Sequence, residues 1–120
     1  QIDKDVCYSE VGRANQDLAA CDKILNQDVK DRCYSVIGAL KRDYAICDKA
    51  SDQVIKDYCY SRTAVVKQEL SVCDSLQSQE PKDWCYNGIA LIKKDISICN
   101  KIATQTIKDG CYEKLKEKSS

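Results

Sequence analysis

The sequence predicts an all-α protein, an αα-hairpin solenoid cross-linked by disulfides, and three observations support this fold class. The nine cysteines follow one another at alternating spacings of 14 and 12 residues, which defines a repeating unit of 26 residues. Within each unit apolar residues recur at helical spacing, and residues of the N-cap type precede them. About four and a half units, each with a long and a short helix, predict nine helices.

The repeat divides residues 1–120 into the parts of one domain, because each unit packs only against its neighbours. Every unit starts with Lys-Asp, one variable residue and Cys-Tyr. The expected units span 4–29, 30–55, 56–81 and 82–107, and a terminal half-unit spans 108–120.

The long helix of each unit contains the Cys-Tyr pair. After Cys33, apolar residues follow four and seven positions later at Ile37 and Leu40, which places them on one helix face. A small residue next to the first of these positions favours a close helix crossing, at Gly12, Gly38, Ala64 and Ala90. N-cap residue types stand seven residues before each later Cys-Tyr cysteine, at Asn26, Asp52, Ser78 and Thr104.

A shorter helix of about two turns follows in each unit. An acidic residue, which suits the positive end of a helix, precedes it at Asp17, Asp43, Glu69 and Asp95. Apolar residues and the second cysteine of the unit come next. A helix this short is not stable alone, so packing and a cross-link must hold it.

Helix geometry selects between two regular disulfide schemes. Cys47 lies about 5 Å before the turn near Ser51, and Cys59 lies about 9 Å after it. Pairing within a unit would instead join Cys33, about 13 Å before the turn near Asp43, to Cys47, about 5 Å after it. Partners in an antiparallel hairpin should lie at similar heights, which predicts pairing between units: Cys21–Cys33, Cys47–Cys59, Cys73–Cys85 and Cys99–Cys111.

Cys7 has no partner in this scheme. An odd cysteine in a secreted protein indicates an intermolecular link or a free thiol, and a buried, inert cysteine is the alternative. The chain has no histidine and no C-x-x-C pair, so we expect no metal, cofactor or thioredoxin-type site.

The chain has the composition of a secreted protein. Its cysteine content is typical of disulfide scaffolds, and it starts at Gln1 and contains no methionine, as after removal of a signal peptide. We therefore expect a secreted, extracellular or cell-surface location.

Charge and motifs argue against several functions. Nineteen basic and nineteen acidic residues cancel, which gives no electrostatic reason to bind nucleic acid or an anionic membrane. No apolar run is long enough for membrane insertion. Without histidine, Ser-His and Cys-His catalysis are excluded. The acids recur because the unit recurs, and Gln27 stands one helical turn from Asp31, within reach of a hydrogen bond.

The rhythm D-x-C-Y, C-x-K-I, K-D-x-C-Y extends from Lys4 to Leu115. It resembles cysteine-bearing helical repeats of secreted, often archaeal, proteins, and more distantly tetratricopeptide and Sel1-like repeats, whose units are longer. The resemblance implies a solenoid that scaffolds and binds, and it carries over no catalytic residue.

Positions that differ between units are the candidates for recognition. One such position is the residue directly before each Cys-Tyr pair, and the other lies four residues after that position. Trp, Tyr and Arg are enriched in binding hot spots. The candidate binding surface is therefore Arg32, Tyr58, Arg62 and Trp84. The alternative is that Tyr58 and Trp84 fill the seam between units beside Val65 and Leu91.

Polar residues replace apolar ones at both ends of the repeat, at Arg13 and at Glu117. Such replacements are typical of caps that keep a solenoid soluble, but their opposite charges also suit head-to-tail end contacts. We expect a non-catalytic secreted scaffold that acts through protein–protein contacts. A structural subunit of an extracellular filament is the first alternative, and a carboxylate-dependent hydrolase is the second.

Overall fold

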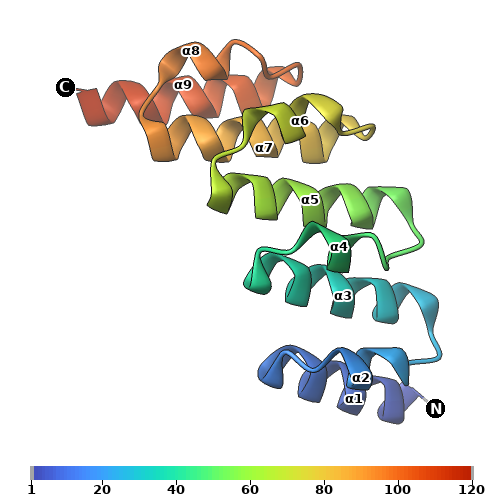
Figure 1. The fold of residues 1–120 in the computed structure, drawn as a ribbon. Coiled ribbons are helices and arrows are strands. Elements are labelled where there is room, and N and C mark those ends of the chain that lie inside the picture. The colour runs from blue at the N-terminus through green and yellow to red at the C-terminus, as the bar shows by residue number, and fades with distance from the viewer. Residues whose placement is uncertain (1, 120) are drawn as a thin grey trace.

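The computed structural model describes residues 2–119, and for side chains residues 4–116. This part of the chain contains nine helices and no strand, which confirms the all-α, disulfide-linked fold class (Figure 1). The long helices are α1 (Ile2–Asn15), α3 (Gln27–Lys41), α5 (Gln53–Lys67), α7 (Gln79–Lys93) and α9 (Gln105–Ser119). The short helices are α2 (Leu18–Asp22), α4 (Tyr44–Cys47), α6 (Leu70–Ser75) and α8 (Ile96–Cys99).

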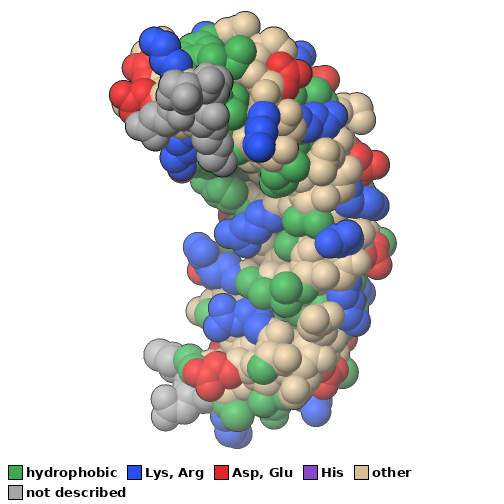
Figure 2. Space-filling model, turned by 90° about the vertical axis from the view of Figure 1, so that its left-hand side faces the viewer, with side chains coloured by type: hydrophobic (Ala, Val, Ile, Leu, Met, Phe, Trp, Pro, Cys, Tyr) green, Lys and Arg blue, Asp and Glu red, His purple; other side chains and the backbone are tan. Residues whose placement is uncertain are grey.

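The molecule is elongated, with extents of 50 × 25 × 23 Å. Each long helix packs on the next long helix along the chain, and each short helix packs on the long helices before and after it. The long helices therefore form a stack from α1 to α9 (Figure 1). The stack curves, and the space-filling view shows a hollow on one side (Figure 2).

Two of the predicted N-caps, Asn26 and Asp52, cap their long helices, and Ser78 is an informative exception. The side chains of Asn26 and Asp52 accept hydrogen bonds from the backbone N–H three residues later, at 3.1 and 3.0 Å. Ser78 precedes α7 but its side chain makes no capping bond. The residue three positions after Ser78 is Pro81, which has no N–H to donate.

The short helices are capped as the sequence predicts in three of four cases. Asp17, Asp43 and Asp95 accept a hydrogen bond from the backbone N–H two residues later. Glu69 makes no such bond, and its carboxylate accepts a 2.5 Å hydrogen bond from the Tyr44 hydroxyl instead.

A left-handed residue ends each of the first four long helices, a feature that the sequence does not predict. The residues have φ between 52° and 57°, and none is glycine: Gln16, Arg42, Gln68 and Lys94. After α3, the N–H of Asp43 bonds to the carbonyl of Gly38 at 2.9 Å. This reversal lets the short helix start within two residues of the long one.

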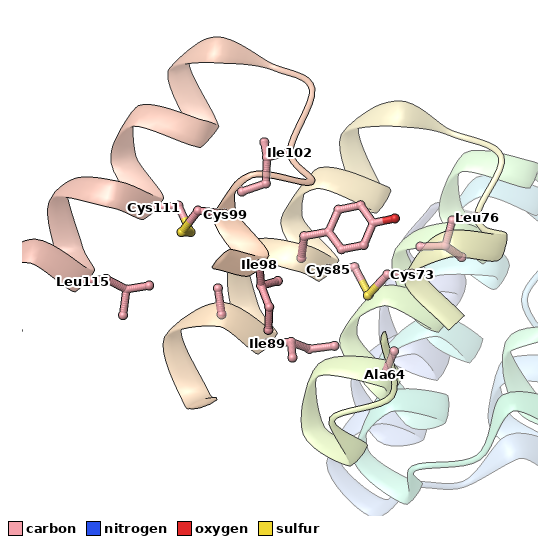
Figure 3. Packing of buried hydrophobic residues seen from close by; sticks show 12 residues of the cluster. Ala64, Cys73, Leu76, Cys85, Ile89, Ile98, Cys99, Ile102, Cys111 and Leu115 are labelled. Atoms are coloured by element: carbon pink, nitrogen blue, oxygen red, sulfur yellow. A yellow bond between two sulfur atoms is a disulfide. The ribbon is translucent and has the colours of Figure 1, made fainter. Parts of the chain in front are cut away.

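The four disulfides join the pairs that the height argument selects: Cys21–Cys33, Cys47–Cys59, Cys73–Cys85 and Cys99–Cys111. All eight sulfurs belong to fully buried residues. Figure 3 shows two of these disulfides among Ile89, Ile98 and Ile102 in the C-terminal part of the core. Each closes a short loop and stabilises the fold by about 3 kcal/mol.

The small residue of α1 and of α3, Gly12 and Gly38, makes room for a disulfide. A Cβ atom on Gly38 would lie 2.7 Å from the sulfur of Cys59 and 3.1 Å from that of Cys47. The backbone N of Cys47 would lie 3.3 Å away, so the short helix also approaches closely. The predicted close crossing is therefore a crossing with the short helix and its disulfide.

One expectation about the core is wrong. Leu40 and its repeat equivalent Ile92, expected on the buried face, are about half exposed. At about 100° per residue, the buried face of α3 is centred near Tyr34 and Gly38, so Leu40 stands at its edge.

Candidate binding groove

The recurring aspartate of the Lys-Asp pair ties each unit to the next. Asp31 on α3 is 1% exposed and accepts hydrogen bonds from the backbone N–H of Ser51 at 3.0 Å and of Asp52 at 2.9 Å. The Ser51 hydroxyl and the Gln27 amide donate to the same carboxylate, at 3.0 and 2.7 Å. Equivalent bonds to the loop 20 and 21 residues later are made by Asp5, Asp57 and Asp83.

These bonds decide the protonation state of the buried aspartate. Burial alone would raise the pKa of Asp31, but the hydrogen bonds from Ser51, Asp52 and Gln27 together lower it below its usual value of 3.8. The pKa of Asp83 is lowered in the same way. Asp31 and Asp83 are therefore held ionised by their hydrogen bonds to backbone N–H groups of the following loop.

The recurring tyrosine of the Cys-Tyr pair has a structural role as well. The Tyr34 hydroxyl donates to Asp22, the residue after the disulfide-bonded Cys21. The same bond recurs twelve residues apart in the pairs Tyr60–Asp48, Tyr86–Asp74 and Tyr112–Asn100. Burial and the bond to Asp22 raise the pKa of Tyr34 to about 12. Each disulfide is thus accompanied by a hydrogen bond between the same two helices.

Residues that vary between units come together in two hollows over the long helices. A hollow of about 410 Å³ lies over α1, α3 and α5, and its lining includes Arg13, Arg32, Val36, Ile55, Tyr58 and Arg62. A second hollow of about 510 Å³ lies over α5 and α7, and its lining includes Tyr58, Arg62, Val65, Val66, Trp84 and Gly88. The two hollows share Tyr58 and Arg62 and therefore adjoin, and we call them together the groove.

The groove has one apolar half, between α5 and α7. A Cβ atom on Gly88 would lie 2.6 Å from the side chain of Val65, so glycine lets the two helices approach here. Trp84 is 44% exposed and Val66 is similarly exposed. The apolar half therefore presents aromatic and aliphatic surface to the solvent.

Arginines dominate the other half of the groove. Arg13, Arg32 and Arg62 come from three successive long helices. Two acids stand near them with partners of their own. Asp28 accepts a 3.0 Å bond from Arg32, and Glu80 accepts a hydrogen bond from the Tyr58 hydroxyl. Burial and this bond to Glu80 raise the pKa of Tyr58 above 10.0.

The structure brings together all four residues of the candidate surface, Arg32, Tyr58, Arg62 and Trp84. Trp84 is too exposed to fill a seam between units. Arg13, expected in an end contact, also lines the groove, and a further hollow of about 200 Å³ has Arg13, Val6 and Arg32 in its lining. The side chain of Glu117 lies outside the described residues.

Val66 was missed as a groove residue. It occupies the repeat position of Leu40, seven residues after a Cys-Tyr cysteine, which the apolar periodicity assigned to the core. Its exposure follows only from the direction of the buried face, whose centre lies elsewhere around the helix axis.

Cys7 is exposed and makes no disulfide in the structure, so the buried, inert alternative for this residue is wrong. Among the described residues, no cluster of three or more His, Cys, Asp or Glu is placed to hold a metal ion. None of the described helices combines the length and the apolar character that crossing a membrane requires.

Comparison of the chain with protein-family models, with curated proteins and with solved structures finds no match. The helical repeat is established by the chain's own pattern and structure. The similarity to tetratricopeptide and Sel1-like repeats remains a resemblance.

Proposed function

We propose that the protein is a non-catalytic scaffold that binds a segment of another protein in the groove. The observation that carries this proposal is that recurring and variable residues lie in different places and make different contacts. Recurring polar residues such as Asp31 and Tyr34 form hydrogen bonds within the stack of helices, which we call the frame, whereas residues that vary between units gather in the groove. Solenoids commonly bind partners along their hollow side.

An oxidising compartment fits this scaffold. Four intrachain disulfides are buried in the core of the described chain. Such bonds form and persist in secreted and cell-surface proteins, and cytosolic reductants oppose them. The proposed location is therefore the cell exterior or the cell surface.

The carboxylate-dependent hydrolase is the weakest of the three functions considered. An acid–base pair of this kind needs two carboxyl groups that reach a substrate. Asp31 and Asp83 are buried and bound by loop backbone, and the paired Asp28 and Glu80 bond to Arg32 and Tyr58.

A displayed library of random peptides tests the binding function. Peptides are selected on the oxidised chain and then measured against Trp84→Ala, with Leu25→Ala as the matched control. Leu25 is 71% exposed and lies outside the groove. Loss of a hot-spot tryptophan weakens binding by about 30-fold, corresponding to about 2 kcal/mol. Selected peptides that bind wild type and Trp84→Ala equally, or a library that yields none, would contradict the proposal.

Self-association is a second candidate, and exposed Cys7 on the first helix favours it. Each chain offers one such thiol, so a Cys7–Cys7 disulfide joins two copies and leaves no thiol to bind a third. An open filament needs a further contact, and Arg13, one half of the expected end contact, lies in the groove. Intact mass under non-reducing conditions distinguishes these cases: a dimer lost in Cys7→Ser supports a linked pair, whereas a monomer with one alkylatable thiol contradicts it.

A further inference from the structure

We propose that the segment bound in the groove is acidic and carries one bulky apolar side chain, with its carboxylates over α1, α3 and α5 and its apolar side chain between α5 and α7. This inference rests on the proposed function and adds the chemistry of the partner.

The charge of the groove selects an acidic partner. Every charged residue that lines its two hollows is an arginine: Arg13, Arg32 and Arg62. A guanidinium binds a carboxylate through two parallel hydrogen bonds, and it is the cation best suited to such pairs at interfaces. Val36 and Ile55 line the same hollow, so bound carboxylates would be partly removed from water, which strengthens the attraction.

The other half of the groove selects an apolar side chain. Tyr58, Val65, Val66 and Trp84 surround a hollow in which Arg62 is the one charged lining residue. Trp84 and Val66 keep more than a third of their surface exposed. Covering this surface with a leucine, phenylalanine or tryptophan of the partner removes apolar area from water on both sides.

The spacing of the stacked helices sets the distance between the arginines and the apolar half of the groove. Packed helices lie about 8–10 Å apart, so the step from α3 to α7 covers about 16–20 Å. An extended chain advances about 3.3–3.6 Å per residue and crosses this distance in about five or six residues. A helical segment would need about twelve residues. In an extended segment, the acids would therefore lie about five residues from the apolar anchor.

Arginines beside aromatic rings also suit a single-stranded nucleic acid, and the observations favour the protein segment. The chain carries equal numbers of basic and acidic residues, so it has no net positive charge to attract a phosphate backbone. Asp28 and Glu80 flank the groove, where a continuous phosphate backbone would meet them.

The test uses the same peptide library on three forms of the oxidised chain. The groove variant is Arg13→Glu/Arg62→Glu. The control is Lys41→Glu/Lys49→Glu, which makes the same change of charge outside the groove and, with Lys41, in the last turn of a long helix as Arg13 is. Circular dichroism and intact mass check the fold and disulfides of each form.

Wild type is expected to select peptides with acids about five residues from a large apolar residue, and their affinity falls as salt rises. The same peptides should bind the groove variant at least about tenfold more weakly and the control as wild type, because two attractions become repulsions. The groove variant should itself select basic peptides.

Three outcomes overturn the inference. Neutral or basic peptides that still depend on Trp84 would refute the acidic partner and leave the proposed function standing. A random single-stranded oligonucleotide that displaces the acidic peptides at comparable concentration would replace the protein segment by nucleic acid. Peptides that ignore Trp84 altogether would remove both the inference and the proposed function.

Discussion

Replacing Asp31 by asparagine tests whether the recurring aspartate holds neighbouring units together. The side chain keeps its shape, but one carboxylate oxygen becomes an NH₂ group. In the structure one oxygen accepts from Ser51 N–H and Gln27, and the other accepts from Asp52 N–H and the Ser51 hydroxyl. Either orientation of the new amide therefore directs a donor at a buried backbone N–H.

The size of the effect follows from these bonds. A hydrogen bond to a charged group contributes about 1.5–3 kcal/mol, and bonds that share one acceptor are not additive. Asparagine retains half of the acceptors and loses the charge, so we expect Asp31→Asn to lower the free energy of unfolding by about 2–3 kcal/mol.

Asp109 provides the matched control, because it occupies the same repeat position in the last half-unit. It is exposed and accepts a hydrogen bond from Gln105 at 2.7 Å. Asp109→Asn should therefore have the small effect of a surface substitution. Urea unfolding with the disulfides intact, followed by circular dichroism, compares the two variants. Hydrogen exchange at the amides of Ser51 and Asp52 reports the clamp locally and should accelerate only in Asp31→Asn.

The pH dependence gives a second readout of the same clamp. The pKa of Asp31 and that of Asp83 lie below 3.8 in the folded state. A carboxyl group whose pKa is lower in the folded state than in the unfolded state stabilises the protein at pH values above its unfolded-state pKa. This stabilisation is lost as the pH falls through the folded-state pKa. Wild type should therefore weaken below about pH 4, and Asp31→Asn should weaken less. Equal unfolding midpoints for Asp31→Asn and Asp109→Asn, or unchanged exchange at Ser51, would refute the reasoning.

Three further predictions concern the frame and its first helix. The pKa values of Tyr34 and Tyr60 are raised to about 12, so their stabilisation is present below pH 10 and lost as pH rises from 10 to 12. Alkaline unfolding should show this loss, and Tyr34→Phe should reduce it. Gln68→Gly should raise the melting temperature by relieving a left-handed conformation, a gain of about 1 kcal/mol, whereas Lys67→Gly, one residue earlier in the helix, should lose about 1 kcal/mol. Cys7 should react fully with a maleimide without denaturant, one thiol per chain; a thiol that reacts only after unfolding would contradict its exposed position.

Much of the fold could be predicted because its signals are local. The spacing of Cys47 and Cys59 sets their heights in a hairpin, and those heights decide the disulfide pairing before any tertiary structure is known. Asn26 likewise marks a helix start by its own side-chain chemistry. Such features depend on a few neighbouring residues, so they repeat with the unit.

The remaining features depend on the whole stack. Gln68 adopts the left-handed conformation without the glycine that signals it, so only the tight reversal into α6 requires that conformation. Leu40 was assigned to the core because periodicity gives the direction of a face and not its width. The sequence did not place Arg13 in the groove, because it does not say toward which side the stack curves.

The separation of frame and groove residues has a consequence for how this protein can change. Asp31 and Tyr34 act within the frame, and each unit touches only its neighbours, so the frame does not depend on what the groove contains. Arg62 and Trp84 are exposed, and other residue types stand at their positions in the other units. Substitutions at these two positions should therefore alter binding and leave the unfolding midpoint close to wild type, whereas Asp31→Asn should do the reverse. A loss of stability in Trp84→Ala as large as that in Asp31→Asn would show that the groove is part of the frame.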